Sequence, residues 1–225
     1  MTTVRRRLRV ALLLALTIAV AVFASACPRF SGSVSHRGTP LPSGVPVYAY
    51  VGTTVCGSAT IQDGRYELWV SSAEQQPGCG YEGATVRFEV SAGPFAYQAG
   101  SYSWTASGDT ILDLNAVYHS AANSYRGHAR GAYDGKAVPN GIPVQAWVEG
   151  TLCGQTTISG GDGSYQLTVP SEGERAGCGY PTATVSFTVG SGPGTTYPAG
   201  STNWPAGGGI TTTFDLLVQS LRTVP

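Results

Sequence analysis

The chain has 225 residues, with 13 basic and 13 acidic side chains. Glycine and proline together account for 45 residues, or 20 %. That share favours many turns but stays below the roughly 25 to 30 % typical of low-complexity disorder. Because 42 % of residues are hydrophobic and only 12 % are charged, the chain can form hydrophobic cores but is a poor candidate for general nucleic-acid binding.

Residues 1–26 are predicted to be an export signal. Four arginines within the first nine residues precede an uncharged apolar run from Val10 to Phe23, which ends in Ala24-Ser25-Ala26. The run is shorter than the roughly 20 residues that cross a bilayer as a helix, so cleavage is favoured over a retained signal anchor. Without this segment, 9 basic and 13 acidic residues remain, and the exported form is mildly acidic.

The five cysteines predict two disulfide bonds. Cys56 and Cys79 lie in the contexts Cys-Gly and Gly-Cys-Gly-Tyr, and the same contexts recur at Cys153 and Cys178. Because exported cysteines pair in an oxidising compartment, we expect bridges from Cys56 to Cys79 and from Cys153 to Cys178. A zinc site is the alternative, but the paired spacing that such sites use is missing.

The fifth cysteine, Cys27, directly follows Ala24-Ser25-Ala26. These residues resemble a bacterial lipobox, in which the cysteine is acylated and becomes the new N-terminus, although leucine is usual where Ala24 stands. The same residues fit ordinary A-x-A cleavage, which would give a soluble secreted protein. We expect lipidation of Cys27, and with it a membrane partner, because an unpaired exported thiol otherwise lacks an explanation.

The mature chain is a tandem repeat. The stretch Gly44 to Val51 reappears 97 positions later as Gly141 to Val148, and after a two-residue insertion the offset becomes 99. We expect a first module over residues 27–118, a linker over 119–124 and a second module over 125–225.

Each copy alternates apolar and polar residues with period two, which indicates strands with one buried face. We expect an all-β fold of two tandem antiparallel β-sandwiches with about seven strands each. The expected inward residues are Val47, Ala49, Val51, Tyr66, Leu68, Val70, Val86, Phe88 and Val90, and in the second copy Val144, Ala146, Val148, Tyr165, Leu167, Val169, Val185, Phe187 and Val189.

The motifs of each copy resemble the carboxypeptidase-regulatory-like modules of bacterial surface proteins. In the first copy they are Phe-Ser-Gly-Ser-Val at residues 30–34, Gly-x-Pro-Val-x-Ala-x-Val at 44–51, Asp-Gly-x-Tyr-x-Leu-x-Val at 63–70 and Ala-Thr-Val-x-Phe-x-Val at 84–90. The resemblance implies a transthyretin-like, seven-stranded sandwich, grouped near carbohydrate-binding-like folds. It also implies a non-catalytic accessory or adhesive role, since its motifs are turn and core residues.

The sequence offers no catalytic or cofactor-binding set. The three histidines His36, His119 and His128 are not in a ligand spacing, and the latter two are expected to be exposed around the linker. Hydrolase, zinc-protease and phosphate-loop motifs are absent from the sequence. We therefore expect a protein that is not an enzyme and needs no metal or cofactor.

Two Asp-Gly pairs could be read as calcium ligands, but one aspartate in a loop provides too few oxygen atoms. Asp63-Gly64 and Asp162-Gly163 are better explained as hairpin turns, in which glycine tolerates a positive φ. Asp113 and Asp215 are expected to point outward from a terminal strand.

Outward aromatic residues of the first copy give a candidate ligand-binding surface. If Asp63-Gly64 is a two-residue turn, Ser58 lies opposite Trp69, and Tyr48 lies opposite Ser58 on the preceding strand. Tyr48, Ser58 and Trp69 would then form one row that stacks a sugar ring of a polysaccharide or a side chain of a surface protein. The alternative is that these rings only cover the outer sheet face or a contact between modules.

The remaining large aromatic residues are expected to have packing roles. Tyr50 and its counterpart Trp147 are predicted beside Cys56 and Cys153, and therefore against the disulfides. Trp104 and Trp204 recur with fixed neighbours and are expected in the core or at its rim.

Overall fold

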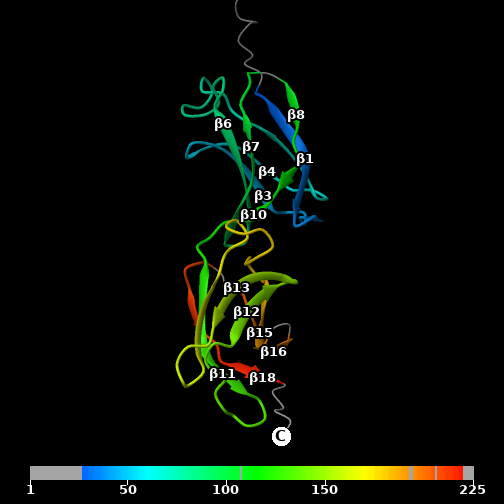
Figure 1. Cartoon of the computed structure of the whole chain (residues 1–225). Helices are drawn as coiled ribbons and strands as arrows, with labels where there is room; N and C mark the ends of the chain where they lie inside the picture. Colours follow the sequence, from blue (N-terminus) through cyan, green and yellow to red (C-terminus); the bar gives the residue numbers. More distant parts are fainter. Residues whose placement is uncertain (1–26, 107, 193–194, 206, 220–225) are drawn as a thin grey trace, which may run out of the picture. The chain divides into compact units, whose positions relative to one another are not determined.

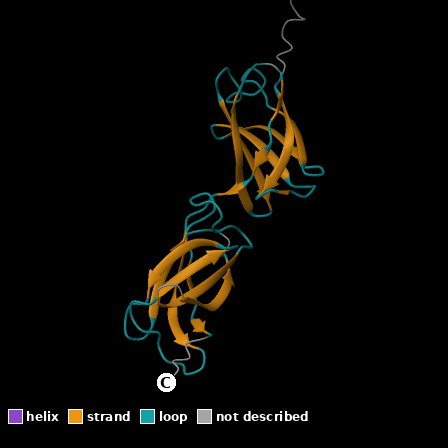
Figure 2. Ribbon diagram, turned by 45° about the vertical axis from the view of Figure 1, so that its right-hand side comes forward, coloured by secondary structure: helices purple, strands orange, loops and turns teal. Residues whose placement is uncertain are grey.

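The computed structural model describes residues 27–106, 108–192, 195–205 and 207–219, and the expected export signal lies outside this part. The described residues form β-strands joined by loops, and no helix is present among them (Figures 1 and 2). The expectation of an all-β fold is confirmed. No helix within the described residues is long and apolar enough to cross a membrane.

Contacts between Cα atoms divide the chain into two compact units. Of the described residues, those in 27–91 and 99–116 belong to the first unit, and those in 92–98 and 117–219 belong to the second. The last change of unit along the chain falls between Ala116 and Val117, and the first long strand of the second copy begins at Asn123, inside the segment expected to be a linker.

The first copy has strands β1 Arg29–His36, β2 Thr39–Pro40, β3 Pro46–Val51, β4 Thr54–Thr60, β5 Arg65–Trp69, β6 Thr85–Ala92, β7 Phe95–Ser103, β8 Asp109–Ile111, β9 Leu114–Asn115 and β10 Val117–Tyr118. The second copy has β11 Asn123–Gly131, β12 Pro143–Val148, β13 Thr151–Thr157, β14 Ser164–Val169, β15 Thr184–Gly192, β16 Thr195–Asn203, β17 Thr211–Thr213 and β18 Leu216–Val218.

Each copy is a sandwich of two sheets. In the first, β2, β5, β8 and β9 all pair with β1, while the second sheet has the order β10-β7-β6-β3-β4. The second copy repeats this plan, with β14, β17 and β18 around β11 opposite a sheet of order β13-β12-β15-β16. The eighteen inward residues expected from the alternation are all buried, so the two-sided packing is confirmed.

The last strands of each copy differ from the expected antiparallel arrangement. Strands β8 and β9 pair parallel with β1, and β17 and β18 pair parallel with β11. Between β8 and β9 the chain passes directly over Gly32, where an added Cβ would lie 2.2 Å from the carbonyl oxygen of Leu112. Glycine is required there because any side chain would collide with this backbone.

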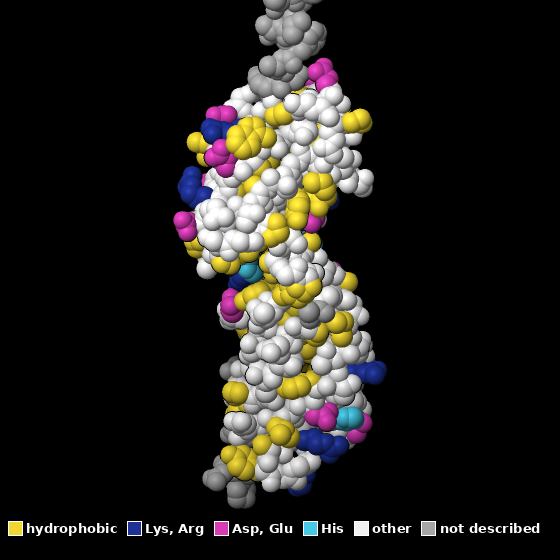
Figure 3. All heavy atoms as spheres, turned by 180° about the vertical axis from the view of Figure 1, so that it is seen from behind, with side chains coloured by type: hydrophobic (Ala, Val, Ile, Leu, Met, Phe, Trp, Pro, Cys, Tyr) yellow, Lys and Arg dark blue, Asp and Glu magenta, His cyan; other side chains and the backbone are white. Residues whose placement is uncertain are grey.

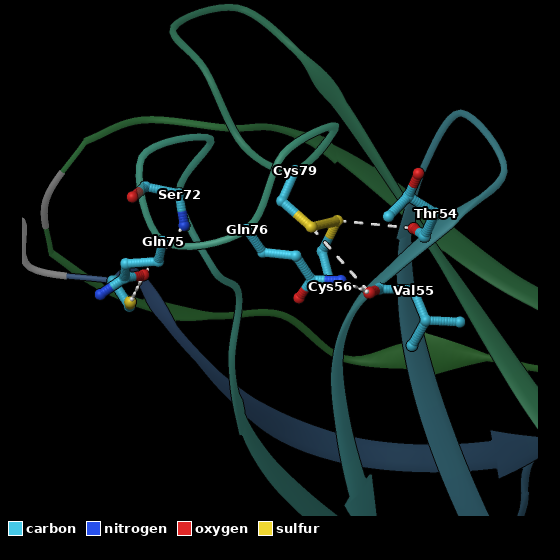
Figure 4. The surroundings of a disulfide bond; sticks show 8 residues. Thr54, Val55, Cys56, Ser72, Gln75, Gln76 and Cys79 are labelled. Carbon is cyan, nitrogen blue, oxygen red and sulfur yellow. Dashed lines mark hydrogen bonds between the residues drawn. A yellow bond between two sulfur atoms is a disulfide. The ribbon is translucent and has the colours of Figure 1, made fainter.

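Both expected disulfides are present. Cys56 bonds to Cys79 and Cys153 bonds to Cys178, with Cα–Cα distances of 5.4 and 5.5 Å. In Figure 4 the side chain of Gln76 reaches beside the first bridge, and its amide donates to the carbonyl of Val55 at 2.9 Å. Each bridge ties the loop after β5 or β14 to the strand at the edge of the other sheet.

The first Asp-Gly turn has the expected form. Asp63 and Gly64 have φ values of 50° and 73°, and Gln62 pairs with Arg65 across them. The second Asp-Gly pair does not form a two-residue turn, because the two-residue insertion makes a longer loop that Ser159 and Ser164 close with a 2.9 Å backbone hydrogen bond.

Candidate functional site

Tyr48 and Ser58 of the expected aromatic row lie side by side. They are direct partners in the ladder between β3 and β4, as predicted. Tyr48 is half-buried and Ser58 is exposed, so both stand on the outer face of their sheet.

Trp69 does not join this row, and the prediction of three adjacent strands is wrong. Strand β5 pairs with β1 in the opposite sheet, where Trp69 lies opposite Arg29. The hairpin ladder ends after the single bridge between Gln62 and Arg65, because the chain crosses from one sheet to the other at the Asp63-Gly64 turn. Strands β4 and β5 then meet only at the sandwich edge.

The aromatic neighbour of Tyr48 is Tyr50, whose ring centroid lies 6.3 Å away. A β-bulge between Ala49 and Tyr50 shifts the register, so Tyr50 faces Val55 rather than Cys56. Its ring lies under the guanidinium of Arg87, at 5.3 Å, on the outer face of the sheet. The predicted position beside the disulfide is therefore wrong.

Trp147 follows the same pattern in the second copy. The equivalent bulge lies between Ala146 and Trp147, which places Trp147 opposite Leu152 rather than Cys153. Its indole N–H donates to the hydroxyl of Thr188 at 3.0 Å. Its expected position beside the disulfide is also wrong, and for the same reason.

Trp69 instead belongs to a polar surface on the β5-β1-β8 sheet, which we call the Trp69 face: Arg29, Glu67, Trp69, Asp109 and Ile111. Arg29 lies between two carboxylates, at 3.1 Å from Glu67 and 2.6 Å from Asp109. Its hydrogen bonds with Asp109 and then Glu67 raise the pKa of Arg29. Trp69 and Ile111 are 55 % and 81 % exposed, so an aromatic ring and an alkyl group border the exposed ion pairs of Arg29.

The equivalent face of the second copy is polar and hollowed. A pocket of about 470 Å³ is lined by Arg126, Gly127, His128, Ser159, Ser164, Tyr165, Gln166 and Thr213. The Nε2 and Nδ1 atoms of His128 lie 3.2 Å from Asp162 and 3.5 Å from Asp215. Hydrogen bonds from Ser164 hold the pKa of Asp162 below its usual value. His128 therefore lies in β11 and not around the linker, while its side chain is 42 % exposed.

The structure also locates the two remaining tryptophans, two histidines and Cys27. Trp104 and Trp204 are 5 % and 3 % exposed, which confirms their packing role. His119 is exposed, as expected, and His36 ends β1. Cys27 is half-buried, and its thiol donates to Oε1 of Gln75 at 2.6 Å.

Asp113 and Asp215 do not lie within a terminal strand. Each is exposed between two short strands, and Asp113 accepts hydrogen bonds from Ser33 while Asp215 accepts one from the backbone of His128. The expected alternation fails because both terminal strands break at this point.

The described residues hold no group of three His, Cys, Asp or Glu side chains that could bind a metal ion. The surfaces above offer hydrogen-bonding groups, ion pairs and exposed rings. Sequence reasoning missed the Trp69 face and the Arg126–His128 pocket, because both depend on pairing with β1 or β11. The one available signal was that the two copies differ at these outward positions.

These features define an all-β protein of two compact units, with one disulfide inside each copy. No family model matches the chain, and no curated protein matches it. Among solved structures, the TIE protein of Bacillus anthracis is 10 % identical with a TM-score of 0.39, over 86 % of this chain and 34 % of that one. This chain therefore spans about a third of that protein.

Two pilins are also similar. The shaft pilin SpaA of Lactobacillus rhamnosus GG is 13 % identical with a TM-score of 0.28, over 89 % of this chain and 100 % of that one. The minor pilin GBS52 of Streptococcus agalactiae is 8 % identical with a TM-score of 0.29, over 88 % and 98 %.

Proposed function

We propose that this chain is a non-catalytic protein of the bacterial cell envelope, built of tandem carboxypeptidase-regulatory-like modules, with a structural or adhesive role. The observation that carries the proposal is the pair of disulfides, one in each copy. Such bonds form and persist in oxidising compartments outside the cytosol. The predicted export signal leads to the same compartment.

The surface composition supports a binding or structural role without nucleic acid. On the face that Figure 3 shows, charged side chains are scattered in small groups among wide uncharged areas. A nucleic-acid binder needs a basic stripe or patch instead.

The location is tested by expressing the full chain in a bacterium and separating cytosol, membrane and medium. We expect the protein in the membrane fraction or the medium, with all four repeat cysteines unreactive toward alkylating reagents until a reductant is added. A cytosolic protein with freely alkylated cysteines would contradict the proposal.

The proposal includes a lipid anchor on Cys27. Support comes from the lipobox-like sequence and from the lack of a disulfide partner for Cys27 among the described cysteines. Intact mass of the membrane-extracted protein should show a chain that begins at Cys27 and carries acyl groups. Cys27→Ser should release the protein from membranes, and an unmodified Cys27 in the native protein would exclude the anchor.

A second candidate function is carbohydrate binding by the first copy. The Trp69 face favours it, because a sugar can stack on an exposed indole while its hydroxyls bond to charged groups beside the ring. Tyr48 and Ser58 lie on the other sheet, so they would form a separate contact.

A panel of immobilised polysaccharides tests this second function. Trp69→Ala should reduce retention at least tenfold, while Thr168→Ala at the equivalent position of the second copy should leave retention unchanged. Tyr48→Ala tests the separate contact. Equal retention of all three variants and the native chain on every glycan would exclude the sugar-binding function.

A further inference from the structure

A small pocket of about 300 Å³ opens on the first copy, within the first unit. Its buried floor is made by Ser72, Gly80 and Trp104. Its exposed lining includes Glu74, Tyr81 and Glu82, with Tyr81 60 % exposed. None of these residues belongs to the Trp69 face or to the pair Tyr48 and Ser58 on the other sheet.

Two polar groups on the pocket floor have no hydrogen-bond partner among the described residues. They are the hydroxyl of Ser72 and the indole N–H of Trp104, on side chains that are each 5 % exposed. Buried polar groups are nearly always satisfied in folded proteins. An unsatisfied hydroxyl on the floor of an open pocket therefore points to a ligand that completes it.

The second copy shows what can complete this hydroxyl. The constant offset of 99 makes Ser171 the counterpart of Ser72. The hydroxyl of Ser171 donates to the backbone carbonyl of Ser120 at 2.7 Å. The N–H of Gly173, at the position of Glu74, donates to the carbonyl of Tyr118 at 2.9 Å. The N–H of Tyr118 in turn donates to the carboxylate of Glu172 at 3.3 Å.

The bound segment is the stretch of chain that precedes β11, and its first residue, Tyr118, also pairs with Tyr97 of β7 as part of β10. The residues that follow this segment are also held by a backbone hydrogen bond, in which Gly209 donates its N–H to the carbonyl of Ala122 at 3.2 Å. A short peptide segment thus lies over Ser171, Glu172 and Gly173 and bonds through its backbone.

The first copy has no such segment among its described residues. When β1 and β11 are aligned on Gly32 and Gly127, the positions of Tyr118 to Ala121 correspond to residues 23–26, which lie outside the described part. The predicted cleavage after Ala26 would remove them from the mature protein.

We propose that the Ser72–Trp104 pocket binds a peptide segment of a partner protein, in the way that Ser171 and Gly173 bind residues 118–120. The hydroxyl of Ser72 donates to a peptide carbonyl, as Ser171 does. This site goes beyond the proposed function but rests on the cleavage after Ala26 that the proposed export includes. Binding to the mature chain can be measured wherever the protein is located, so a failure of binding is distinguishable from a failure of the proposed location.

The pocket residues specify the chemistry of the peptide. A Cβ at Gly173 would lie 2.2 Å from the ring of His119. Because Glu74 replaces this glycine, the peptide needs a small residue where the second copy has His119. The carboxylate of Glu82, in the exposed lining, disfavours acidic peptides. The best match is a neutral or basic segment with small side chains.

The peptide Val-Tyr-Ala-Ser-Ala-Ala, which is residues 117–122 with alanine in place of His119, provides the probe. Labelled with a fluorophore, it should bind the mature chain saturably in an anisotropy titration. Ser72→Ala should weaken binding roughly three- to tenfold, the ratio expected for one hydrogen bond. The unaltered segment, with histidine, should bind more weakly than the probe.

Two matched variants separate binding from folding. Ser171→Ala should leave probe affinity unchanged but lower the thermal midpoint, because it breaks a formed hydrogen bond. Ser72→Ala should leave the midpoint unchanged or raise it, since it removes an unsatisfied group. Ala73→Glu, which copies Glu172, should tighten binding by supplying an acceptor for a peptide N–H.

Three outcomes would overturn the inference: no saturable binding by the native chain and the Ala73→Glu variant, equal affinity for Ser72→Ala and the native chain, or dimerisation of the chain that the probe abolishes. The last result would make a second copy, and not a partner protein, the source of the peptide.

Discussion

The carboxylate of Asp113 accepts two hydrogen bonds from Ser33, one from its N–H at 2.8 Å and one from its hydroxyl at 2.7 Å. The second copy keeps the backbone bond, from His128 to Asp215 at 2.8 Å. In both copies an exposed aspartate thus connects the short segment between two terminal strands to the first long strand. That segment lies between β8 and β9 in the first copy and between β17 and β18 in the second.

The contact between Asp113 and Ser33 predicts a loss of stability in acid. Its hydrogen bonds with Ser33 hold the pKa of Asp113 below its ordinary value. A lowered pKa in the folded state contributes stability that is complete above the unfolded value of about 3.9 and disappears as pH falls through the folded value. Urea unfolding between pH 2 and 6 should show a weaker pH dependence for Asp113→Asn. Identical pH profiles would contradict this assignment.

Loss of either disulfide should destabilise mainly its own unit. The bridges span 23 and 25 residues in sequence, for which the chain-entropy relation gives about 3 kcal/mol. Calorimetry of a Cys56→Ser/Cys79→Ser variant should show one transition moved down, with the other near its native temperature. Equal shifts of both transitions would mean that the units do not unfold separately.

Gly32→Ala should cost about 1–3 kcal/mol of unfolding free energy, because its methyl group would collide with the backbone at Leu112. Gly161→Ala is the matched control, since nothing lies within 4 Å of an added Cβ there. Chemical denaturation of both variants provides the measurement. A native-like Gly32→Ala variant would show that the crossing chain can move away.

The two tryptophans of the first copy should behave differently. Trp104→Ala removes a buried ring and should cost about 3–5 kcal/mol. Trp69→Ala alters a side chain that is 55 % exposed and should stay within about 0.5 kcal/mol of the native chain. Denaturation followed by circular dichroism compares them. A large cost at Trp69 would indicate that its ring packs on the sheet and is not available to a ligand.

Much of the fold could be predicted from the repeated pattern. The alternation identified every inward residue named for β3, β5 and β6, and the repeated contexts of Cys56 and Cys79 identified their bond. These features could be predicted because the alternation involves neighbouring residues and the cysteine contexts occur in both copies.

The candidate surface could be predicted only in part. The period of two places Trp69 outward, but it does not say which sheet β5 joins after the Asp63-Gly64 turn. The bulge before Tyr50 likewise leaves no local signal, because one extra residue in β4 produces it. The peptide proposed for the Ser72–Trp104 pocket could not be predicted either, because it is inferred from the chain segment that lies over Ser171 in the folded second copy.

The parallel pairing of β1 with β8 and β9 also determines how each copy responds to tension. The chain enters and leaves such a module at opposite ends of the paired strands, so a pull on its termini acts along the strands and loads their hydrogen bonds together. The residues enclosed by each disulfide cannot lengthen under that pull while the bond is intact.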